Sequence, residues 1–289
     1  MRLSLKQLKK LEDTPPWDWP EGTGAALLEV LRDSAATEKE LLVAVEMAGN
    51  SVVVDDDLVG ALLAVLRNSQ VSEGVRGRAA IALGPVLELA NSEVVGSGTG
   101  HFDDPDSVPI SERTFHEIQQ ALHRLYLDAT VPKVVRRRIL EAAVRGSQDW
   151  HQDAVRAAYA CDDEEWKLTA VFGMRHVRGF DEQILASLES KNPEIHVEAV
   201  WAAGAWPVEA AWQHVVDLVR ARDTERTLLL AAITAVGEIH PKDAPVVLEH
   251  LEDSDDPEIR EAVLEATSMT GERDEEDDDL EEEEPDPLN

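Results

Sequence analysis

Two aromatic residues and a group of charged residues are the first candidates for a binding site in this sequence. Phe172 and Trp201 hold the same place in two neighbouring copies of a repeat, and most other copies have a polar residue there. Aromatic and arginine side chains supply much of the binding energy of protein interfaces. We therefore predict a partner-binding patch around these two rings. Its predicted members are Phe172, Trp201, Arg137, Arg138, Arg145, His176 and Glu198.

A structural role is the alternative for the same residues. The two rings can fill gaps between helices, and the arginines can pair with nearby acidic residues in exposed ion-pair ladders. A further interpretation applies to the basic run from Lys133 to Arg145, which can bind an acidic partner segment or the acidic end of the chain itself. The sequence leaves these alternatives open.

Side chains that could catalyse a reaction or hold a metal are sparse. The nine histidines are scattered, and no two of them are four residues apart, the spacing with which one helix face holds zinc. The single cysteine, Cys161, precedes two aspartates whose charge disfavours its thiolate. We therefore expect no catalytic residue, no metal site and no cofactor, and we predict that the protein is not an enzyme.

The repeat that contains Trp201 predicts how the chain folds. In residues 193–205, PEIHVEAVWAAGA, small or apolar residues follow Ile195 at offsets of 4, 7 and 9 positions. A fixed period of this kind is typical of stacked helix pairs, whose helices approach closely at small residues. We expect offsets 4 and 7 to be buried and offsets 3, 6 and 10 to line a groove. The six other copies start at Glu40, Val75, Val135, Trp166, Leu228 and Ile259.

Seven helix pairs follow from this frame. Asn192 before Pro193, and Asp256 before Pro257, are typical starts of second helices. Gly84, Gly204 and Gly237 are predicted to end helices in left-handed turns. The predicted pairs are 24–33 with 38–48, 56–68 with 73–89, 111–128 with 132–145, 150–160 with 163–175, 181–189 with 193–204, 208–221 with 224–238, and 243–252 with 257–269.

Three regions are expected along the chain. Residues 1–23 form an N-terminal helix and a cap in which Trp17 and Trp19 cover the first repeat. Residues 24–271 form the solenoid, interrupted by a loop at about 91–112 that is rich in Gly, Ser, Asp and Pro. Residues 272–289 form a disordered acidic tail, because so few apolar side chains cannot offset the entropy of ordering.

The repeats resemble HEAT repeats, in particular the short variety of bacterial HEAT-repeat proteins and bilin lyases. The resemblance rests on residues 75–84 (VRGRAAIALG), 193–204 (PEIHVEAVWAAG) and 257–268 (PEIREAVLEATS). It implies an all-α, right-handed α-solenoid of about seven helix pairs, an armadillo-like architecture that commonly acts as a protein-binding scaffold. Deoxyhypusine hydroxylase-like members hold two irons with four His-Glu dipeptides, whereas this chain has only His116-Glu117.

The charge favours a protein partner over nucleic acid. The chain has 59 acidic and 27 basic residues, a net charge of −32, which repels phosphate backbones; solubility is the simpler reason for such acidity. No apolar run suits a signal peptide or a membrane span, so we expect a cytoplasmic protein with no membrane partner. We predict a non-catalytic scaffold that binds a protein or peptide along its second helices. A lyase-like role with a small molecule or chromophore is the alternative, and nucleic-acid binding or DNA repair comes third.

Overall fold

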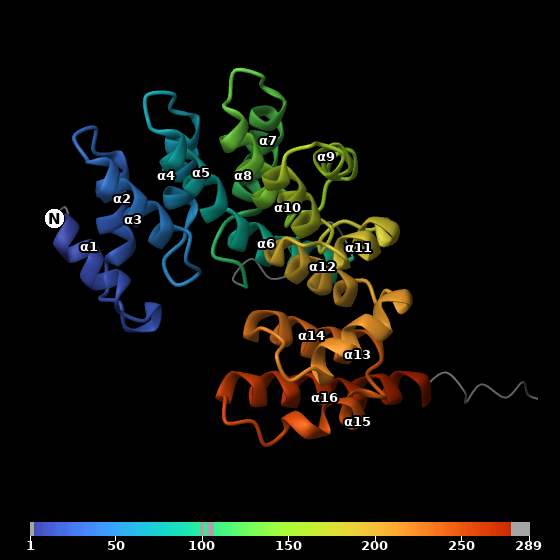
Figure 1. Ribbon diagram of the computed structural model, residues 1–289. Helices are drawn as coiled ribbons and strands as arrows, with labels where there is room; N and C mark the ends of the chain where they lie inside the picture. Colours follow the sequence, from blue (N-terminus) through green and yellow to red (C-terminus); the bar gives the residue numbers. More distant parts are fainter. Residues whose placement is uncertain (1–2, 99–100, 103–106, 279–289) are drawn as a thin grey trace, which may run out of the picture. The chain divides into compact units, whose positions relative to one another are not determined.

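The protein is built from helices in two compact units. The computed structural model describes residues 3–98, 101–102 and 107–278, and every regular element within these ranges is helical (Figure 1). The units are Met1–Cys161 and Asp162–Asn289. The division falls inside the fourth predicted helix pair, because α9 (Trp150–Tyr159) packs on the preceding helix and α10 (Glu164–Gly173) packs on a later one. The predicted solenoid of residues 24–271 is therefore two units.

The first unit has two layers of helices. The first helices of successive pairs lie side by side, α2 on α4 and α4 on α7, and the second helices do the same, α3 on α5 and α5 on α8. The helix α1 packs against α3, and α6 packs against α7 and α8. The elements are α1 Leu5–Glu12, η1 Pro16–Asp18, α2 Thr23–Arg32, α3 Glu38–Ala48, α4 Asp56–Arg67, α5 Glu73–Ala82, α6 Gly84–Ser97, α7 Glu112–Leu127, α8 Lys133–Ala143 and α9 Trp150–Tyr159.

The second unit repeats this arrangement. Its second helices form one row, in which α10 packs on α12, α12 on α14 and α14 on α16. Arg226 links the starts of the last two, since it donates to Asp256 at 2.6 Å and to Glu258 at 2.5 Å. The elements are α10 Glu164–Gly173, α11 Asp181–Leu188, α12 Pro193–Ala205, η2 Glu209–Ala211, α13 Trp212–Arg220, α14 Arg226–Ile239, α15 Ala244–Leu248, η3 Glu249–Leu251 and α16 Pro257–Asp278.

The burial of the second helices confirms the sequence frame and the all-α solenoid architecture within each unit. Every residue at offsets 4 and 7 is buried, whereas the residues at offset 6 are half-buried or exposed. The buried ones are Ala44, Met47, Ala79, Ala82, Ile139, Ala142, Ala170, Gly173, Ala199, Ala202, Ala232, Ala235, Val263 and Ala266. The accessible ones are Glu46, Ile81, Glu141, Phe172, Trp201, Thr234 and Glu265.

The glycines at offset 9 have a different role from the predicted one. None of them is left-handed; in the described part of the chain the glycines with positive φ are Gly22, Gly98 and Gly179. The glycines at offset 9 lie instead where successive second helices meet. A Cβ atom on Gly237 would be 2.8 Å from the carbonyl oxygen of Ala266, and one on Gly204 would be 3.0 Å from Ala235 Cα. The missing side chain therefore sets the distance between neighbouring repeats.

Local capping explains where the second helices begin. The side chain of Asn192 accepts hydrogen bonds from the backbone of Glu194 at 3.0 Å and Ile195 at 3.5 Å, and Pro193 occupies the first helical position. Thr37 and Glu40 form a reciprocal capping box at the start of α3. These contacts satisfy backbone N–H groups that have no partner within the helix. Helices α3 and α12 begin at their predicted residues, whereas α14 begins at Arg226, two residues after its predicted start at 224.

The N-terminal cap is formed by only one of its two predicted tryptophans. Trp19 is partly buried against the core, and its indole N–H donates to the carbonyls of Leu11 at 3.0 Å and Thr14 at 2.9 Å. Leu8 of α1 is fully buried. Trp17 is 78% exposed, so it does not cover the first repeat as predicted.

The predicted loop and tail are shorter than expected. Helix α6 extends to Ser97 inside the predicted loop, and Val108 and Ile110 at its far end are buried in the first unit. Helix α16 extends to Asp278, seven residues into the predicted tail. The rest of that tail, residues 279–289, lies outside the described residues.

One stretch of the described residues, Glu73–Ser97, is long and apolar enough to cross a membrane by length and composition. It consists of α5 and α6, and its Val75, Ala79 and Leu87 are completely buried in the first unit. Core helices of globular proteins meet the same criterion, so this stretch is weak evidence for a membrane span.

Candidate functional site

The predicted patch is divided between the two units. Arg137, Arg138 and Arg145 belong to the first unit, at and just after α8. The other four predicted residues belong to the second unit, on α10, on the turn after it and on α12. These four are Phe172, His176, Glu198 and Trp201.

Two of the three arginines of the first unit take part in packing between its repeats, and the third is buried. Arg137 is buried, with 7% of its surface exposed, and therefore does not line a surface groove as predicted. Arg138 donates to Glu141 at 2.6 Å, and Arg145 forms an ion pair with Glu88. The aliphatic parts of these two side chains cover glycines of the preceding repeat. A Cβ atom on Gly77 would be 3.3 Å from Arg138 Cγ, and one on Gly84 would be 2.9 Å from Arg145 Cδ. Their role matches the structural alternative.

The residues of the second unit converge on an arginine that the sequence frame did not select. The guanidinium carbon of Arg175 lies 4.9 Å from the ring centroid of Trp201 and 5.8 Å from that of Phe172. Arg175 Nη1 is 3.5 Å from Glu198 Oε2, and both side chains are partly exposed, 31% and 23%. We call Phe172, Arg175, His176, Glu198 and Trp201 the Arg175 cluster; its His176 ring lies 5.3 Å from the ring of Phe172.

Two neighbouring second helices and one turn position these side chains. Glu198 and Trp201 are three residues apart on α12, so they lie on one face of that helix. Helix α10 ends at Gly173, and the following turn contains Arg175. Trp206, just after α12, donates from its indole nitrogen to the carbonyl of Met174 at 2.6 Å. This bond ties the turn to the end of α12 and brings Arg175 over the Trp201 ring.

Arg175 was missed for an identifiable reason. It occupies offset 9 of its repeat, the position where four other copies have a glycine that packs against the next repeat. The frame therefore assigned it to the end of a helix, among structural positions. Because α10 ends at Gly173, two residues earlier, the chain turns and Arg175 points along the accessible face. A charged residue at an offset that most copies fill with glycine, and none of the others with a charged residue, was the signal in the sequence.

The family of the repeats follows from a comparison with protein-family models. A model of HEAT repeats matches residues 181–268, the part of the second unit from α11 to α16. The chain contains HEAT repeats in this part. The match includes Glu198 and Trp201 and confirms the resemblance inferred from the repeats. No curated protein matches the HEAT-repeat protein along its sequence.

A solved structure requires one correction. The HEAT-repeat protein is similar to human deoxyhypusine hydroxylase in complex with glycerol, with 15% identity, coverage of 92% of this chain and 91% of that chain, and a TM-score of 0.38. Since that protein is an enzyme, the prediction that this chain is not an enzyme, made from its sparse catalytic side chains, does not stand. A likeness this distant carries no argument for any particular activity.

Histidines form two further contacts in the second unit of the HEAT-repeat protein. Nε2 of His196 lies 2.8 Å from Nε2 of His214, which joins α12 to α13. His240 bonds to Glu209 at 2.8 Å and to Asp243 at 3.0 Å, and its ring stacks on Trp212 with centroids 4.3 Å apart. The bond to Glu209 raises the pKa of His240. Burial, followed by the neighbouring His214, lowers the pKa of His196.

Across the described ranges, no three His, Cys, Asp or Glu side chains are close enough together to hold an ion. His116, of the one His-Glu dipeptide, lies 3.3 Å from Gln119 and 3.6 Å from Glu112, both on its own helix α7.

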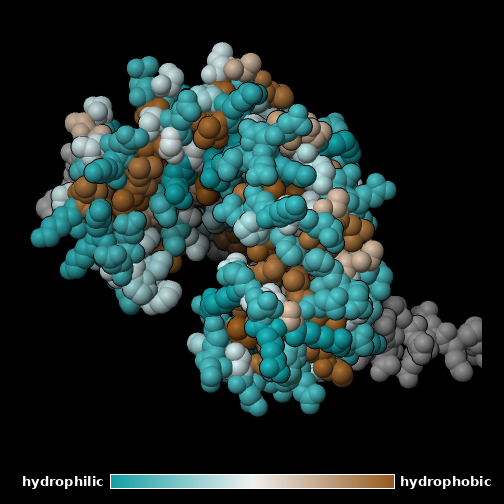
Figure 2. Space-filling view, in the orientation of Figure 1, coloured by the Kyte–Doolittle hydropathy of each residue, from teal (hydrophilic) through white to brown (hydrophobic). Residues whose placement is uncertain are grey.

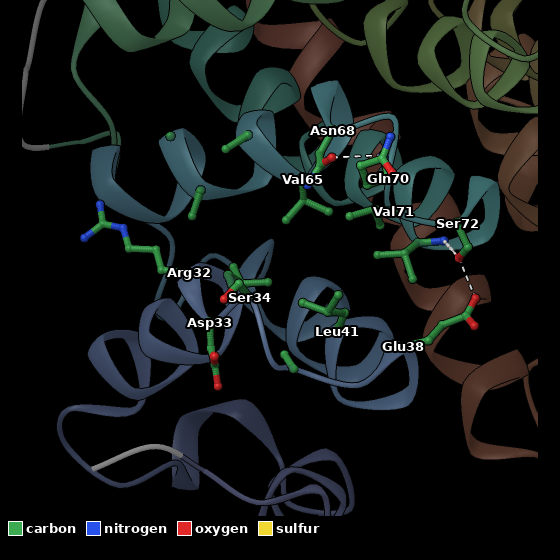
Figure 3. Close-up of a pocket in the computed structure, with 16 residues that line it drawn as sticks. Arg32, Asp33, Ser34, Glu38, Leu41, Val65, Asn68, Gln70, Val71 and Ser72 are labelled. Carbon is green, nitrogen blue, oxygen red and sulfur yellow. Dashed lines mark hydrogen bonds between the residues drawn. The ribbon is translucent and has the colours of Figure 1, made fainter.

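The first unit contains a cleft of about 830 Å³ between its first two helix pairs (Figure 3). Its apolar wall includes Leu41, Val65 and Val71. At its rim, Glu38 accepts a hydrogen bond from Ser72 at 2.5 Å, and Arg32 is paired with Asp57 at 2.9 Å. These charged groups bond to the protein itself, and the cleft combines its apolar wall with polar side chains such as Asn68 and Gln70.

Proposed function

We propose that the HEAT-repeat protein binds a protein or peptide on the accessible face of α10 and α12. The observation that carries the proposal is the Arg175 cluster, in which two aromatic rings and a guanidinium meet at a partly exposed surface. Aromatic and arginine residues that are close together and available to a partner are the usual centre of protein interfaces. The other residues at offset 6 are mostly polar, so this place stands out within its own row.

The net charge of the second part of the chain favours a protein partner. The last 128 residues contain 35 acidic and 10 basic residues, a net charge of −25. Hydrophilic side chains dominate the visible face of α13 to α16 (Figure 2). A field of this sign repels nucleic-acid phosphates and attracts basic protein surfaces. A cytoplasmic location, where such partners are available, is part of the proposal.

Substitution of Trp201 tests this function. The full-length protein and its Trp201→Ala variant serve as bait, and captured proteins are quantified by mass spectrometry. We expect partners of the unmodified protein to be depleted about tenfold or more with Trp201→Ala, because an interface hot spot contributes about 2 kcal/mol. Trp17→Ala is the matched control, because that tryptophan is 78% exposed and lies in the other unit.

The comparison of variants decides the outcome. Trp201→Phe preserves an aromatic ring over Arg175 and should retain most of the captured protein. Equal capture by the unmodified protein and by a folded Trp201→Ala variant would show that the cluster is not the interface. Circular dichroism and melting curves establish that each variant is folded.

A further inference from the structure

The Arg175 cluster has the composition of a binding site for a guanidinium group. Arg175 faces two aromatic rings, Trp201 at 4.9 Å and Phe172 at 5.8 Å, and Glu198 supplies a carboxylate 3.5 Å from its Nη1. Aromatic faces and carboxylates are the groups that bind arginine side chains. Resting on the function proposed above, we infer that the two rings and the Glu198 carboxylate bind an arginine of a basic partner segment. Arg175 occupies this site in the absence of the partner.

Arg175 is suited to be replaced. It belongs to a turn and not to a helix, since α10 ends at Gly173. Its ion pair with Glu198 is long, at 3.5 Å, and partly exposed, and pairs of this kind contribute little to stability. The rings and the carboxylate are better fixed, because Glu198 and Trp201 lie within α12 and Phe172 within α10. A guanidinium from outside can therefore take over contacts whose acceptor groups remain in position.

Charge decides which partner fits. With 35 acidic and 10 basic residues after Cys161, this part of the chain repels acidic segments and attracts basic ones. A partner carboxylate that approached Arg175 would also meet Glu198. Departure of Arg175 removes one positive charge from the neighbourhood of Glu198, and an incoming arginine replaces it.

Removal of Arg175 is the direct test. A labelled octapeptide of alternating Arg and Gly is titrated with full-length protein at about 0.15 M salt, where long-range attraction is screened, and followed by fluorescence anisotropy. We expect Arg175→Ala to bind about three- to tenfold more tightly than the unmodified protein, since the peptide no longer competes with a cation–π contact. Arg222→Ala removes the same charge from an exposed site and should change the affinity little.

Two further measurements separate the site from general attraction. Adding Trp201→Ala to Arg175→Ala should abolish the gain, and a peptide with Lys in place of Arg should gain less, since a planar guanidinium stacks better on aromatic rings. The inference is overturned if Arg175→Ala binds no more tightly than Arg222→Ala, or if both peptides gain equally. Arg175→Ser replaces Arg175→Ala if the latter does not fold.

These results are distinguishable from failure of the proposed function. If Trp201→Ala loses the captured partners and Arg175→Ala shows no gain, the interface stands and the exchange of arginines is wrong. If Arg175→Ala binds the peptide less tightly than the unmodified protein, Arg175 itself contacts the ligand, and the inference is wrong in the same way.

Discussion

Two histidines of the second unit should make the stability of the protein depend on pH in opposite directions. Hydrogen bonding to Glu209 raises the pKa of His240, so the folded state favours its charged form. Burial and the adjacent His214 lower the pKa of His196, so the folded state favours its neutral form. A histidine in the unfolded chain has a pKa of about 6.5. Because each folded-state pKa differs from that value, the free energy of unfolding depends on pH.

The contribution of His240 should disappear as the pH rises. Its pKa is higher in the folded state, so the stabilisation is fully present below the unfolded value and is lost as pH rises through the folded value. We therefore expect the difference in melting temperature between the unmodified protein and His240→Gln to be larger at pH 6 than at pH 8.5. The lost stacking on Trp212 adds an offset that does not depend on pH. A difference that grows with pH would refute the assignment.

The His196→Gln variant should behave in the reverse manner. A lowered folded pKa gives stability that is present above the unfolded value and lost as pH falls through the folded value. The unmodified protein should therefore exceed His196→Gln in stability by more at pH 8.5 than at pH 6. Titration of both ring signals by NMR provides an independent check of the two directions, with the His240 signal shifting at higher pH.

At the scale of elements, neighbouring repeats pack closely where a glycine of one second helix lies against the next second helix. Gly49, at the end of α3, is so close to α5 that an added Cβ would be 2.8 Å from Ala82 Cα. Gly204 meets Ala235, and Gly237 meets Ala266, in the same relation between successive copies. Offset 9 of one repeat thus packs on offset 7 of the next. This contact explains why these copies have glycine at offset 9 and alanine at offset 7 of the next copy.

A pair of glycine substitutions tests this packing. Gly49→Ala should destabilise the protein by about 1–3 kcal/mol, because the backbone of Ala82 leaves no room for the methyl group. Gly60→Ala is the matched control within the same unit: nothing lies within 4 Å of its Cβ position on α4, so it should stabilise by about 0.5–1 kcal/mol. Unfolding in urea measures both. Equal effects of the two substitutions would contradict a role for close helix packing.

At the scale of the whole molecule, charge is distributed unevenly along the chain. The first 161 residues have 24 acidic and 17 basic residues, a net charge of −7, against −25 for the remainder. Repulsion within such an acidic chain destabilises the folded state, and it weakens when salt shortens the range of the field. Individual ion pairs such as that of Arg226 weaken too, but excess like charge outweighs them.

Salt should therefore affect stability and binding in opposite ways. Raising NaCl from about 0.01 to about 0.15 M shortens the Debye length from about 30 to about 8 Å, so we expect a higher melting temperature. The same change should weaken binding of a basic peptide, whose approach depends on the unscreened field. KCl should act like NaCl, since screening does not depend on the cation. A melting temperature that falls with either salt would show that ion pairs dominate.

The sequence by itself determined the helices and the frame of burial. Pro193 after Asn192 marked a helix start, and small residues at offsets 4 and 7 marked the buried face, because both signals act within a few residues of the chain. It also indicated that Phe172 and Trp201 are accessible, since their offset lies opposite the buried one. Local signals of this kind are readable without knowledge of what the helices pack against.

Only the tertiary structure decided which side chains meet. Arg138 and Arg145 lie against glycines of the preceding repeat, and Arg145 also pairs with Glu88 there, so these contacts join segments far apart in sequence. Arg175 became the centre of the site because α10 ends early and Trp206 holds the following turn. The division after Cys161 likewise depends on α9 and α10 packing on different neighbours. A repeat frame describes positions within one copy, whereas a site depends on where each helix stops and what lies beside it.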